Sequence, residues 1–258
     1  MGLSEKYRPK QLSDLWQGLD HLAIRVVAWE LQNNKLSGPT LFTAPYGGGK
    51  TTIARITAMR TTCLQPGNHP FEPCLSCNAC RSILRQQASR PYFADPYGYS
   101  EIDCAKVSFD EVCRWVLSEA ASPRMWSEDS AFNLNVVILD EFGRLTIPQQ
   151  KKFLKLLEVS RCLCILCCAD EDDLDPAIRQ RCSIRPLGLP SAELCVKHVC
   201  DMAVAEGGTA NQDAARWLSQ RCGNNPREII KVLGDALTLG DGNLDLTSAE
   251  SALKLRSG

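Results

Sequence analysis

The chain has 258 residues, 44% of them apolar, and its 29 Lys and Arg nearly balance its 30 Asp and Glu, which leaves a formal net charge of -1. This length and apolar content suit one large core or two domains, and they exclude a collagen-like or wholly disordered chain. The balanced charge excludes a globally basic nucleic-acid binder but allows a local basic face.

Neither export nor a membrane span is expected. The longest apolar run, residues 162–169, has eight residues, far fewer than the roughly 20 that a membrane-spanning helix needs. The N-terminal sequence MGLSEKYRPK lacks the apolar core of an export signal. We therefore expect a cytoplasmic protein with no membrane partner, whose 14 cysteines stay reduced.

The first two thirds of the chain alternate between strands and helices. Short apolar runs followed by turn or acidic residues predict strands at residues 40–43, 134–139 and 162–168. The helical spacing of apolar residues at 149–158 predicts a crossover helix. This alternation indicates an α/β domain with a parallel sheet. Buried cysteine behaves as a small hydrophobe, so core packing is our interpretation of Cys162, Cys164, Cys167 and Cys168.

A phosphate loop is predicted after the first strand. Residues 44–51, APYGGGKT, match G-x-x-x-x-G-K-[ST] except that Ala44 replaces the first glycine. Three glycines would let backbone N–H groups converge on phosphate oxygens, Lys50 would reach the β- and γ-phosphates, and Thr51 would bind Mg²⁺. The expected binding residues are Pro45, Gly47, Gly48, Gly49, Lys50, Thr51 and Thr52. A flexible glycine turn is the alternative.

An acidic pair follows the second predicted strand. Asp140 and Glu141 would lie at the carboxyl end of that strand, where the first acid can hold Mg²⁺ and the second can polarise the attacking water. A solvated acidic turn is the alternative interpretation. Combined with the phosphate loop, the pair predicts a protein that binds and hydrolyses a nucleoside triphosphate.

Four cysteines lie close together just after the phosphate-loop helix. Cys63, Cys74, Cys77 and Cys80 fall within 18 residues. Four thiolates complete the tetrahedral coordination of Zn²⁺ and leave no open position, so we predict a structural zinc site. An iron–sulfur cluster and four free thiols are the alternatives. His69 is a candidate substitute ligand, although an ordinary loop residue is the simpler interpretation.

Three arginines just beyond these cysteines raise a further alternative, a zinc-dependent nucleic-acid reader. Arg81, Arg85 and Arg90 could contact phosphates. The segment has few aromatic side chains for base stacking, and a charged helix face explains the arginines equally well.

The last third of the chain is predicted to be helical. Residues 185–190, RPLGLP, indicate a linker. Beyond it, Ser191 is expected to cap one helix, a second helix should stop at Gly223, and a third should start near Pro226. We therefore predict an α/β nucleotide-binding domain at residues 1–187, with the zinc module at about 63–80, and a small all-α lid domain at 188–258.

In chain order these motifs resemble those of the clamp-loader AAA+ ATPases, most closely the gamma/tau subunits of bacterial DNA polymerase III. The four-cysteine insertion is particular to that bacterial branch. The segments that carry the resemblance, besides the phosphate loop, cysteines and acidic pair, are residues 6–9 (KYRP), 15–18 (LWQG), 101–105 (EIDCA), 153–158 (FLKLLE), 178–182 (IRQRC) and 223–227 (GNNPR).

The resemblance implies roles for further residues. Arg181 would be an arginine finger that reaches the ATP of a neighbouring subunit, and Arg227 would sense the γ-phosphate. Tyr7, Arg8 and Pro9 would border the base. The implied partners are other AAA+ subunits, identical or not, and DNA with a sliding clamp or another replication protein. For both Arg181 and Arg227 a surface ion pair is the alternative.

Besides Ala44 in the phosphate loop, the chain departs from this family in two further ways. Two threonines end the family's strand before the finger motif, and a polar group there is its first sensor, whereas this chain has Cys168 and Ala169. Hydrolysis is therefore expected to be weak, and the alternative function is a hydrolysis-poor scaffold that donates Arg181 within a DNA-processing, defence or mobile-element complex. The family's helical collar would follow Gly258, so we expect either a truncated chain or a relative that assembles differently.

Overall fold

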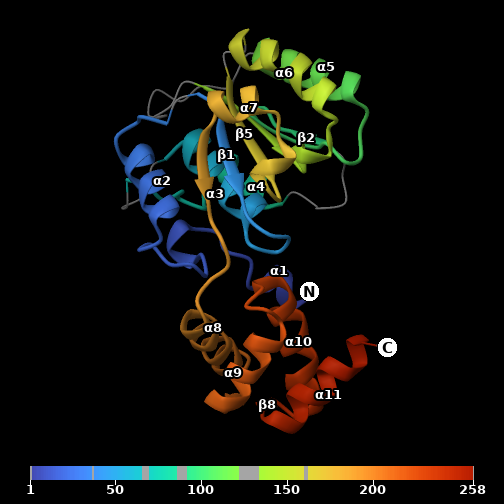
Figure 1. The fold of residues 1–258 in the computed structure, drawn as a ribbon. Coiled ribbons are helices and arrows are strands. Elements are labelled where there is room, and N and C mark those ends of the chain that lie inside the picture. The colour runs from blue at the N-terminus through green and yellow to red at the C-terminus, as the bar shows by residue number, and fades with distance from the viewer. Residues whose placement is uncertain are drawn as a thin grey trace.

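The structure is a computed structural model that describes residues 2–36, 38–65, 70–85, 92–121, 134–159 and 162–257. A sheet with its flanking helices forms one part, and the C-terminal helices form a second part below it in Figure 1. The N-terminal helix α1 (Leu3–Lys6) lies between them, beside α10. The described helices are all too short or too polar to span a bilayer.

Six strands of the described chain form one sheet in the order β2-β3-β4-β5-β1-β6. Neighbouring strands are parallel, except that β2 runs antiparallel to β3. The carboxyl ends of β1, β3 and β4 therefore meet at one edge, where α/β sheets bind their ligands. The strands are β1 (Thr40–Thr43), β2 (Tyr92–Ala94), β3 (Tyr99–Asp103), β4 (Asn135–Asp140), β5 (Cys162–Cys168) and β6 (Ser183–Pro186).

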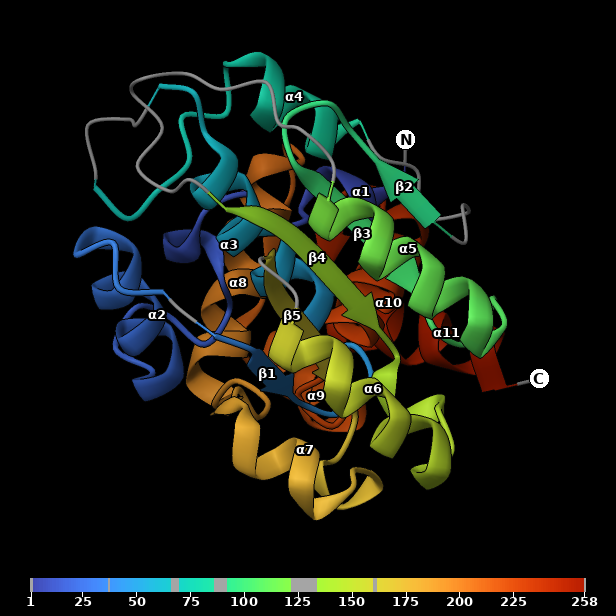
Figure 2. The same ribbon diagram turned by 90° about the horizontal axis from the view of Figure 1, so that it is seen from above.

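Both faces of the sheet are buried, because alternate residues of each strand point to opposite sides. Val136 and Ile138 of β4 belong to one apolar core, while Val137 and Leu139 belong to another. Figure 2 shows α2, α3 and α4 on one side of the sheet and α5, α6 and α7 on the other. These helices are α2 (Leu22–Gln32), α3 (Lys50–Thr62), α4 (Asn78–Leu84), α5 (Phe109–Ala121), α6 (Ile147–Val159) and α7 (Pro176–Arg181).

The C-terminal helices have an apolar core of their own, to which Trp16 from the N-terminal segment also contributes. The hydroxyl of Ser191 accepts a hydrogen bond from the backbone of Leu194, which confirms the predicted cap of α8. The helices are α8 (Ala192–Ala205), α9 (Gln212–Arg221), α10 (Pro226–Leu239) and α11 (Leu246–Ser257). Two short strands that the sequence did not indicate, β7 (Thr209–Ala210) and β8 (Asn243–Leu244), pair with each other in parallel. In the chain, β7 lies between α8 and α9, and β8 lies between α10 and α11.

The predicted linker is wrong at its start. Arg185 and Pro186 belong to β6, which pairs in parallel with β1. This edge strand is only half-buried, so it lacks the apolar run that marked the central strands. Short single-turn 3₁₀ helices complete the description: η1 (Leu12–Asp14), η2 (Phe142–Arg144) and η3 (Glu171–Asp173).

Candidate nucleotide site and cysteine centre

The phosphate loop joins β1 to α3 at the carboxyl edge of the sheet. Gly47 and Gly49 have φ angles of 83° and 98°, a region that favours glycine. A side chain at Gly47 would also collide with Asn225 at the start of α10. Ala44 is not among the residues with positive φ, so alanine causes no backbone strain at the first position of the motif.

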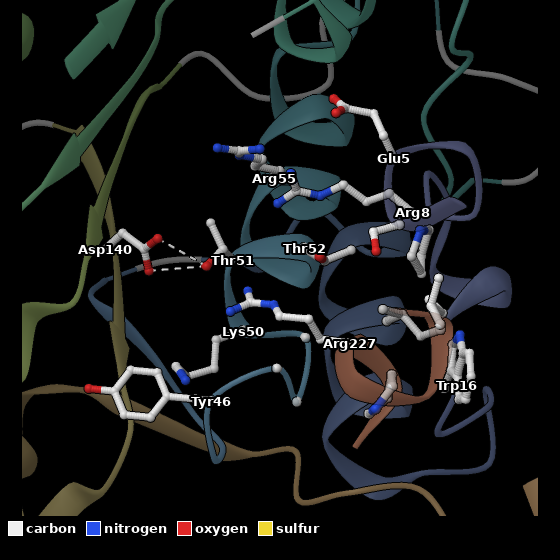
Figure 3. Close-up of a pocket in the computed structure, with 18 of the residues that line it drawn as sticks. Glu5, Arg8, Trp16, Tyr46, Lys50, Thr51, Thr52, Arg55, Asp140 and Arg227 are labelled. Carbon is white, nitrogen blue, oxygen red and sulfur yellow. Dashed lines mark hydrogen bonds between the residues drawn. The ribbon is translucent and has the colours of Figure 1, made fainter. Parts of the chain in front are cut away.

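A cavity of about 520 Å³ lies between this loop, the N-terminal segment and α10 (Figure 3). It brings together predicted site residues from four separate stretches of the chain. They are Tyr7, Arg8, Pro9, Gly47, Gly48, Gly49, Lys50, Thr51, Thr52, Asp140, Glu141 and Arg227. Pro45 belongs to the loop but is not among the lining residues, and Arg181 lies elsewhere on α7.

The reactive side chains of the loop are held by short hydrogen bonds. The buried Lys50 ammonium donates to the carbonyl oxygen of Ala44, 2.7 Å away. The Thr51 hydroxyl donates to the Asp140 carboxylate at 3.0 Å, as the dashed lines of Figure 3 show. A hydroxyl and a carboxylate oxygen thus converge, as the ligand set of an Mg²⁺ ion requires.

Asp140 lies in a concentration of negative charge. Its neighbour across the sheet is Asp103 of β3, and Glu141 follows it in the chain. Burial, reinforced by the nearby charge of Glu101, raises the pKa of Asp140 to about 6. Glu141 has φ 53°, an uncommon left-handed backbone for a residue other than glycine, and its N–H donates to the Asp140 carboxylate at 3.2 Å. A divalent cation placed here would offset this mutual repulsion.

A buried ion pair that lines the same cavity, between Arg55 and Glu101, was missed by the sequence analysis. The Nε of Arg55 on α3 donates to Glu101 of β3 at 2.6 Å, and its Nη2 contacts the other carboxylate oxygen at 2.5 Å. The hydroxyl of Tyr99 donates to the same carboxylate. Arg55 follows Thr51 by one helical turn, so helical periodicity was a signal that could have placed it beneath the phosphate loop.

The N-terminal segment contacts both parts of the molecule. The side-chain amide of Gln17 donates to the carbonyl oxygens of Gly48 and Gly188, at 3.0 and 3.2 Å. The ring of Trp16 stacks on His198 of α8, with the ring centroids 4.8 Å apart. These two residues therefore connect the phosphate loop to the start of the C-terminal helices.

The C-terminal helices reach the phosphate loop directly. The side-chain amide of Asn225, which caps α10, donates to the carbonyl oxygen of Tyr46 at 2.5 Å. Arg227, in the first turn of the same helix, lines the cavity above Lys50 in Figure 3. A rotation of α10 would therefore move Arg227 relative to the loop.

Arg181 is on the outside of the molecule, away from the cavity of its own chain. Its side chain is 50% exposed and forms an ion pair of 2.5 Å with Glu158 of α6. This pair is the surface interaction that the sequence analysis kept as an alternative to the finger role. An exposed pair of this kind holds a side chain only weakly.

The end of β5 carries the thiol of Cys168, at the position that the sequence analysis compared with a threonine of the clamp-loader ATPases. Cys168 is the register partner of Thr43 on β1, and its thiol donates to the carbonyl oxygen of Asp170 at 2.9 Å. Burial raises the pKa of this thiol, so it stays protonated. The whole cysteine-rich run of β5 is buried apart from a half-buried first residue, which confirms the prediction of core packing.

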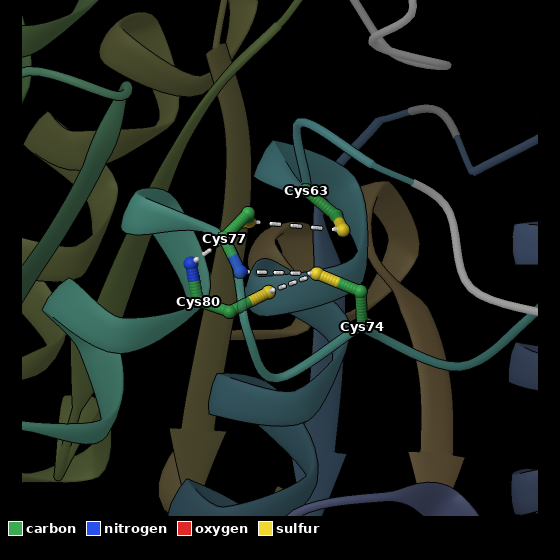
Figure 4. Close-up of side chains that lie close together, drawn as sticks. All are labelled: Cys63, Cys74, Cys77 and Cys80. Carbon is green, nitrogen blue, oxygen red and sulfur yellow. Dashed lines mark hydrogen bonds between the residues drawn. The ribbon is translucent and has the colours of Figure 1, made fainter.

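The four cysteines after α3 converge in space (Figure 4). The sulfurs of Cys63, Cys74, Cys77 and Cys80 all lie within 4.8 Å of one another, and the 63–77 and 74–80 pairs are separated by 4.0 and 3.9 Å. Tetrahedral zinc, with Zn–S bonds of about 2.3 Å, places its sulfurs about 3.8 Å apart. The donor set therefore fits zinc. The hydrogen bond between Cys63 and Cys80 lowers the pKa of Cys63 to about 5 and raises that of Cys80, so without metal Cys63 is the thiolate of this pair.

Comparison with known proteins identifies the family. Residues 20–189 match the family described as "DNA polymerase III, delta subunit". The chain belongs to this family. It is a clamp-loader-like AAA+ protein, as the resemblance of its motifs predicted.

This DNA polymerase III delta-family chain has similar relatives among the gamma and tau subunits. It is 24% identical over 250 residues to subunit tau of Bacillus subtilis, covering 96% of this chain and 41% of that protein. It is 23% identical over 255 residues to subunit gamma of Buchnera aphidicola from Acyrthosiphon pisum, covering 98% and 66%. The chain thus spans less than two thirds of the length of these relatives.

Solved structures confirm the P-loop AAA+ fold of the delta-family chain. The Thermotoga maritima RuvB Holliday junction branch migration motor aligns with a TM-score of 0.62 and 16% identity, covering 96% of this chain and 72% of that one. A mutant form of the same RuvB gives a TM-score of 0.64 at 15% identity, covering 96% and 73%. At this identity the likeness concerns the fold alone.

Parts of the earlier expectations fall outside the described residues. His69, the candidate substitute ligand, and Arg90, the last of the three arginines beyond the cysteines, both lie there. Of the other two arginines, Arg81 is on α4 and Arg85 follows it, and both side chains are exposed.

Proposed function

We propose that this chain binds ATP with Mg²⁺ in the cavity and hydrolyses it as one subunit of an oligomer that acts on DNA during replication. The single observation that carries the proposal is the convergence of a phosphate loop, an acidic pair and Arg227 on one cavity of about 520 Å³. The gamma and tau relatives support the replication context, because their names place them in DNA polymerase III.

Within the cavity, the loop glycines and the N-terminus of α3 would hold the phosphates. Lys50 would exchange its bond to the Ala44 carbonyl for a phosphate oxygen, and Thr51 with Asp140 would hold Mg²⁺. The ion, when bound, would neutralise charge on the phosphates. Glu141, the residue that follows Asp140 just after the end of β4, would orient the attacking water.

The N-terminal segment of the nucleotide-binding domain would also contact the nucleotide. Tyr7, Arg8 and Pro9 border the same cavity and would contact the base or ribose. Residues 1–187 would act as the nucleotide-binding domain and residues 188–258 as a lid. The apolar core of the C-terminal helices supports this division, and the contact of Asn225 with Tyr46 would couple the lid to the phosphate loop.

Arg181 would serve the neighbouring subunit rather than its own. Its exposed position on α7 and its weak surface pairing with Glu158 leave it available to a second AAA+ subunit, identical or different. A guanidinium placed against the transferring phosphoryl group is worth roughly 10³- to 10⁵-fold in rate. DNA and a sliding clamp or another replication protein complete the proposed assembly.

We assign the four cysteines to a structural zinc ion, because a closed set of four thiolates leaves no position for a substrate. The expected composition is one zinc per chain, measured by metal analysis of the purified protein.

The function is tested by steady-state ATP hydrolysis in the presence of DNA. Lys50→Ala should abolish hydrolysis, and Arg181→Ala should lower it at least a hundredfold without loss of nucleotide binding. Arg179→Ala, on the same helix, is the matched control and should remain active. In an oligomer of identical subunits, a mixture of the Lys50→Ala and Arg181→Ala chains should recover activity. The proposal is wrong if the unmutated protein hydrolyses ATP no faster than Lys50→Ala.

A second function, a nucleotide-binding scaffold with little hydrolysis, is favoured by one observation. The Cys168 thiol at the end of β5 is bonded to the Asp170 carbonyl and offers no hydroxyl to a water molecule. If this limits turnover, Cys168→Thr should raise the hydrolysis rate above that of the unmutated protein. An unchanged rate together with tight nucleotide binding would favour the scaffold.

A further inference from the structure

Arg60 is a buried cation next to the four cysteines. It lies on α3 one turn before Cys63, and only 4% of its surface is exposed. Its Nε donates a hydrogen bond of 2.8 Å to the carbonyl oxygen of Pro70, at the start of the described segment that carries the other three cysteines. Its Nη1 is buried and has no hydrogen-bond partner among the described residues. A buried N–H group of a charged side chain destabilises the fold when it lacks a hydrogen-bond partner, and a nearby anion would offset that cost.

The single carboxylate of residues 70–85, that of Glu72, is already engaged elsewhere. Glu72 is buried and accepts hydrogen bonds from the backbone N–H groups of Leu12 and Ser13, at 2.8 and 3.0 Å. The groups that can supply negative charge to Arg60 are thiols instead. Cys63 follows it by three residues at the end of α3, and the Cys80 thiol donates to the carbonyl oxygen of Met59, the residue before Arg60, at 3.8 Å. Burial lowers the pKa of Arg60, whereas the charges of Cys63 and Cys80 act in the opposite direction.

A four-thiolate zinc centre needs such a cation. Four thiolates around one Zn²⁺ leave a net charge of about -2 in a buried place, where uncompensated charge is unfavourable. Backbone N–H groups relieve part of it: Cys77 donates to the Cys74 sulfur at 3.3 Å, and Cys80 donates to the Cys77 sulfur at 3.5 Å. These dipoles spread the charge without cancelling it.

We infer that Arg60 is the charge-balancing residue of this zinc centre: its partly unpaired guanidinium supplies positive charge beside Cys63 and Cys80, and its bond to Pro70 ties the cysteine segment to α3. The inference rests on the assignment of zinc to the four cysteines and is independent of nucleotide chemistry. It makes metal affinity depend on a residue that is not a ligand, as partners of metal ligands commonly do.

Two substitutions separate the charge of Arg60 from its hydrogen bond. Arg60→Gln keeps an N–H donor for the carbonyl oxygen of Pro70 but removes the positive charge. Arg60→Lys keeps the positive charge but replaces the planar guanidinium, with its several N–H donors, by an ammonium group. We expect Arg60→Gln to weaken zinc binding by roughly 10- to 100-fold. We expect Arg60→Lys to stay within about threefold of the unmutated protein. Arg81→Gln removes the same charge from an exposed position of α4 and is the matched control.

Zinc affinity would be measured on the full chain by competition with a chromophoric chelator. Co²⁺ substitution would verify a tetrahedral thiolate spectrum in each variant. If Arg60→Gln is unfolded without metal, the zinc concentration at half-refolding gives the same comparison. Equal affinity of Arg60→Gln and the unmutated chain would overturn the inference, as would loss of affinity in Arg60→Lys with retention in Arg60→Gln. An unmutated chain that binds neither Zn²⁺ nor Co²⁺ would overturn it by removing the zinc centre itself, whatever its ATP hydrolysis.

Discussion

Replacing Asp140 by asparagine should stabilise the nucleotide-free protein and, at the same time, weaken its Mg²⁺-dependent binding of ATP. The carboxylate ends β4 in a half-buried position, where it accepts a hydrogen bond from Thr51 at 3.0 Å. Burial and the nearby charge of Glu101 raise its pKa from the ordinary 3.8 to about 6. The folded protein thus holds a negative charge at neutral pH in a place that disfavours it.

The magnitude follows from the two pKa values. Between pH 3.8 and about 6 the folded protein keeps a proton on Asp140 that the unfolded chain has released. Stability therefore falls as the pH rises through this window, and above it the loss amounts to roughly 3 kcal/mol. Asparagine retains an oxygen for Thr51 but does not ionise, so Asp140→Asn should escape this loss.

Urea unfolding without Mg²⁺ or nucleotide would measure the effect. Asp140→Asn should exceed the unmutated protein by roughly 3 kcal/mol at pH 7.5 and by about half of that at pH 5. Asp201→Asn, on the exposed surface of α8, is the control and should change stability by less than about 0.5 kcal/mol. A variant that is no more stable than the unmutated protein at pH 7.5, or a difference independent of pH, would refute the reasoning.

The same substitution should act in the opposite direction once ligand is added. MgATP stabilises whichever protein binds it, in proportion to the logarithm of its concentration over Kd. The unmutated protein should therefore gain several degrees in its melting temperature with MgATP, and Asp140→Asn should gain much less. Equal gains would show that Asp140 does not hold the ion.

Two further substitutions test the packing around the site by urea unfolding. Arg55→Met should destabilise the protein by about 3 kcal/mol or more, because it removes the ion-pair partner of the buried Glu101 carboxylate. Lys197→Met, which breaks the exposed ion pair with Asp201, is the control and should change stability little. An equally small loss of stability in both variants would contradict the expectation. Gln150→Leu should cost roughly 3 kcal/mol, because this fully buried side chain makes three hydrogen bonds of 2.8 to 3.1 Å to two loops at the sheet edge. Gln149→Leu, on the partly exposed neighbouring position, should lose less than about 1 kcal/mol, and a similar loss in both would argue against a special role of Gln150.

Features that depend on residues close together in the chain could be predicted from the sequence. The phosphate loop is one, because convergence of its N–H groups depends on local glycines, two of which adopt positive φ. The cysteine cluster is another, since its ligands fall within 18 residues. The central strands and the cap at Ser191 follow from local periodicity and from a single side-chain bond.

The pairing of distant polar side chains could not be predicted in this way. Arg55 and Glu101 are 46 residues apart, and Gln17 contacts Gly188 across 171 residues. Nothing in the local sequence around Gln150 indicates that two loops will close over it. Their partners depend on which strands become neighbours and on how the C-terminal helices dock.

The sequence by itself therefore determined the chemistry available to this protein: a cradle for phosphates, acids for a cation and thiols for a metal. Tertiary structure alone decided that Asp140 contacts Thr51, that Arg227 lines the cavity at the phosphate loop, and that Arg181 lies on the outer surface. The reason is physical. Backbone conformation responds to neighbours in the chain, whereas burial and electrostatic pairing respond to neighbours in space, which are set only when the sheet and the helices have assembled.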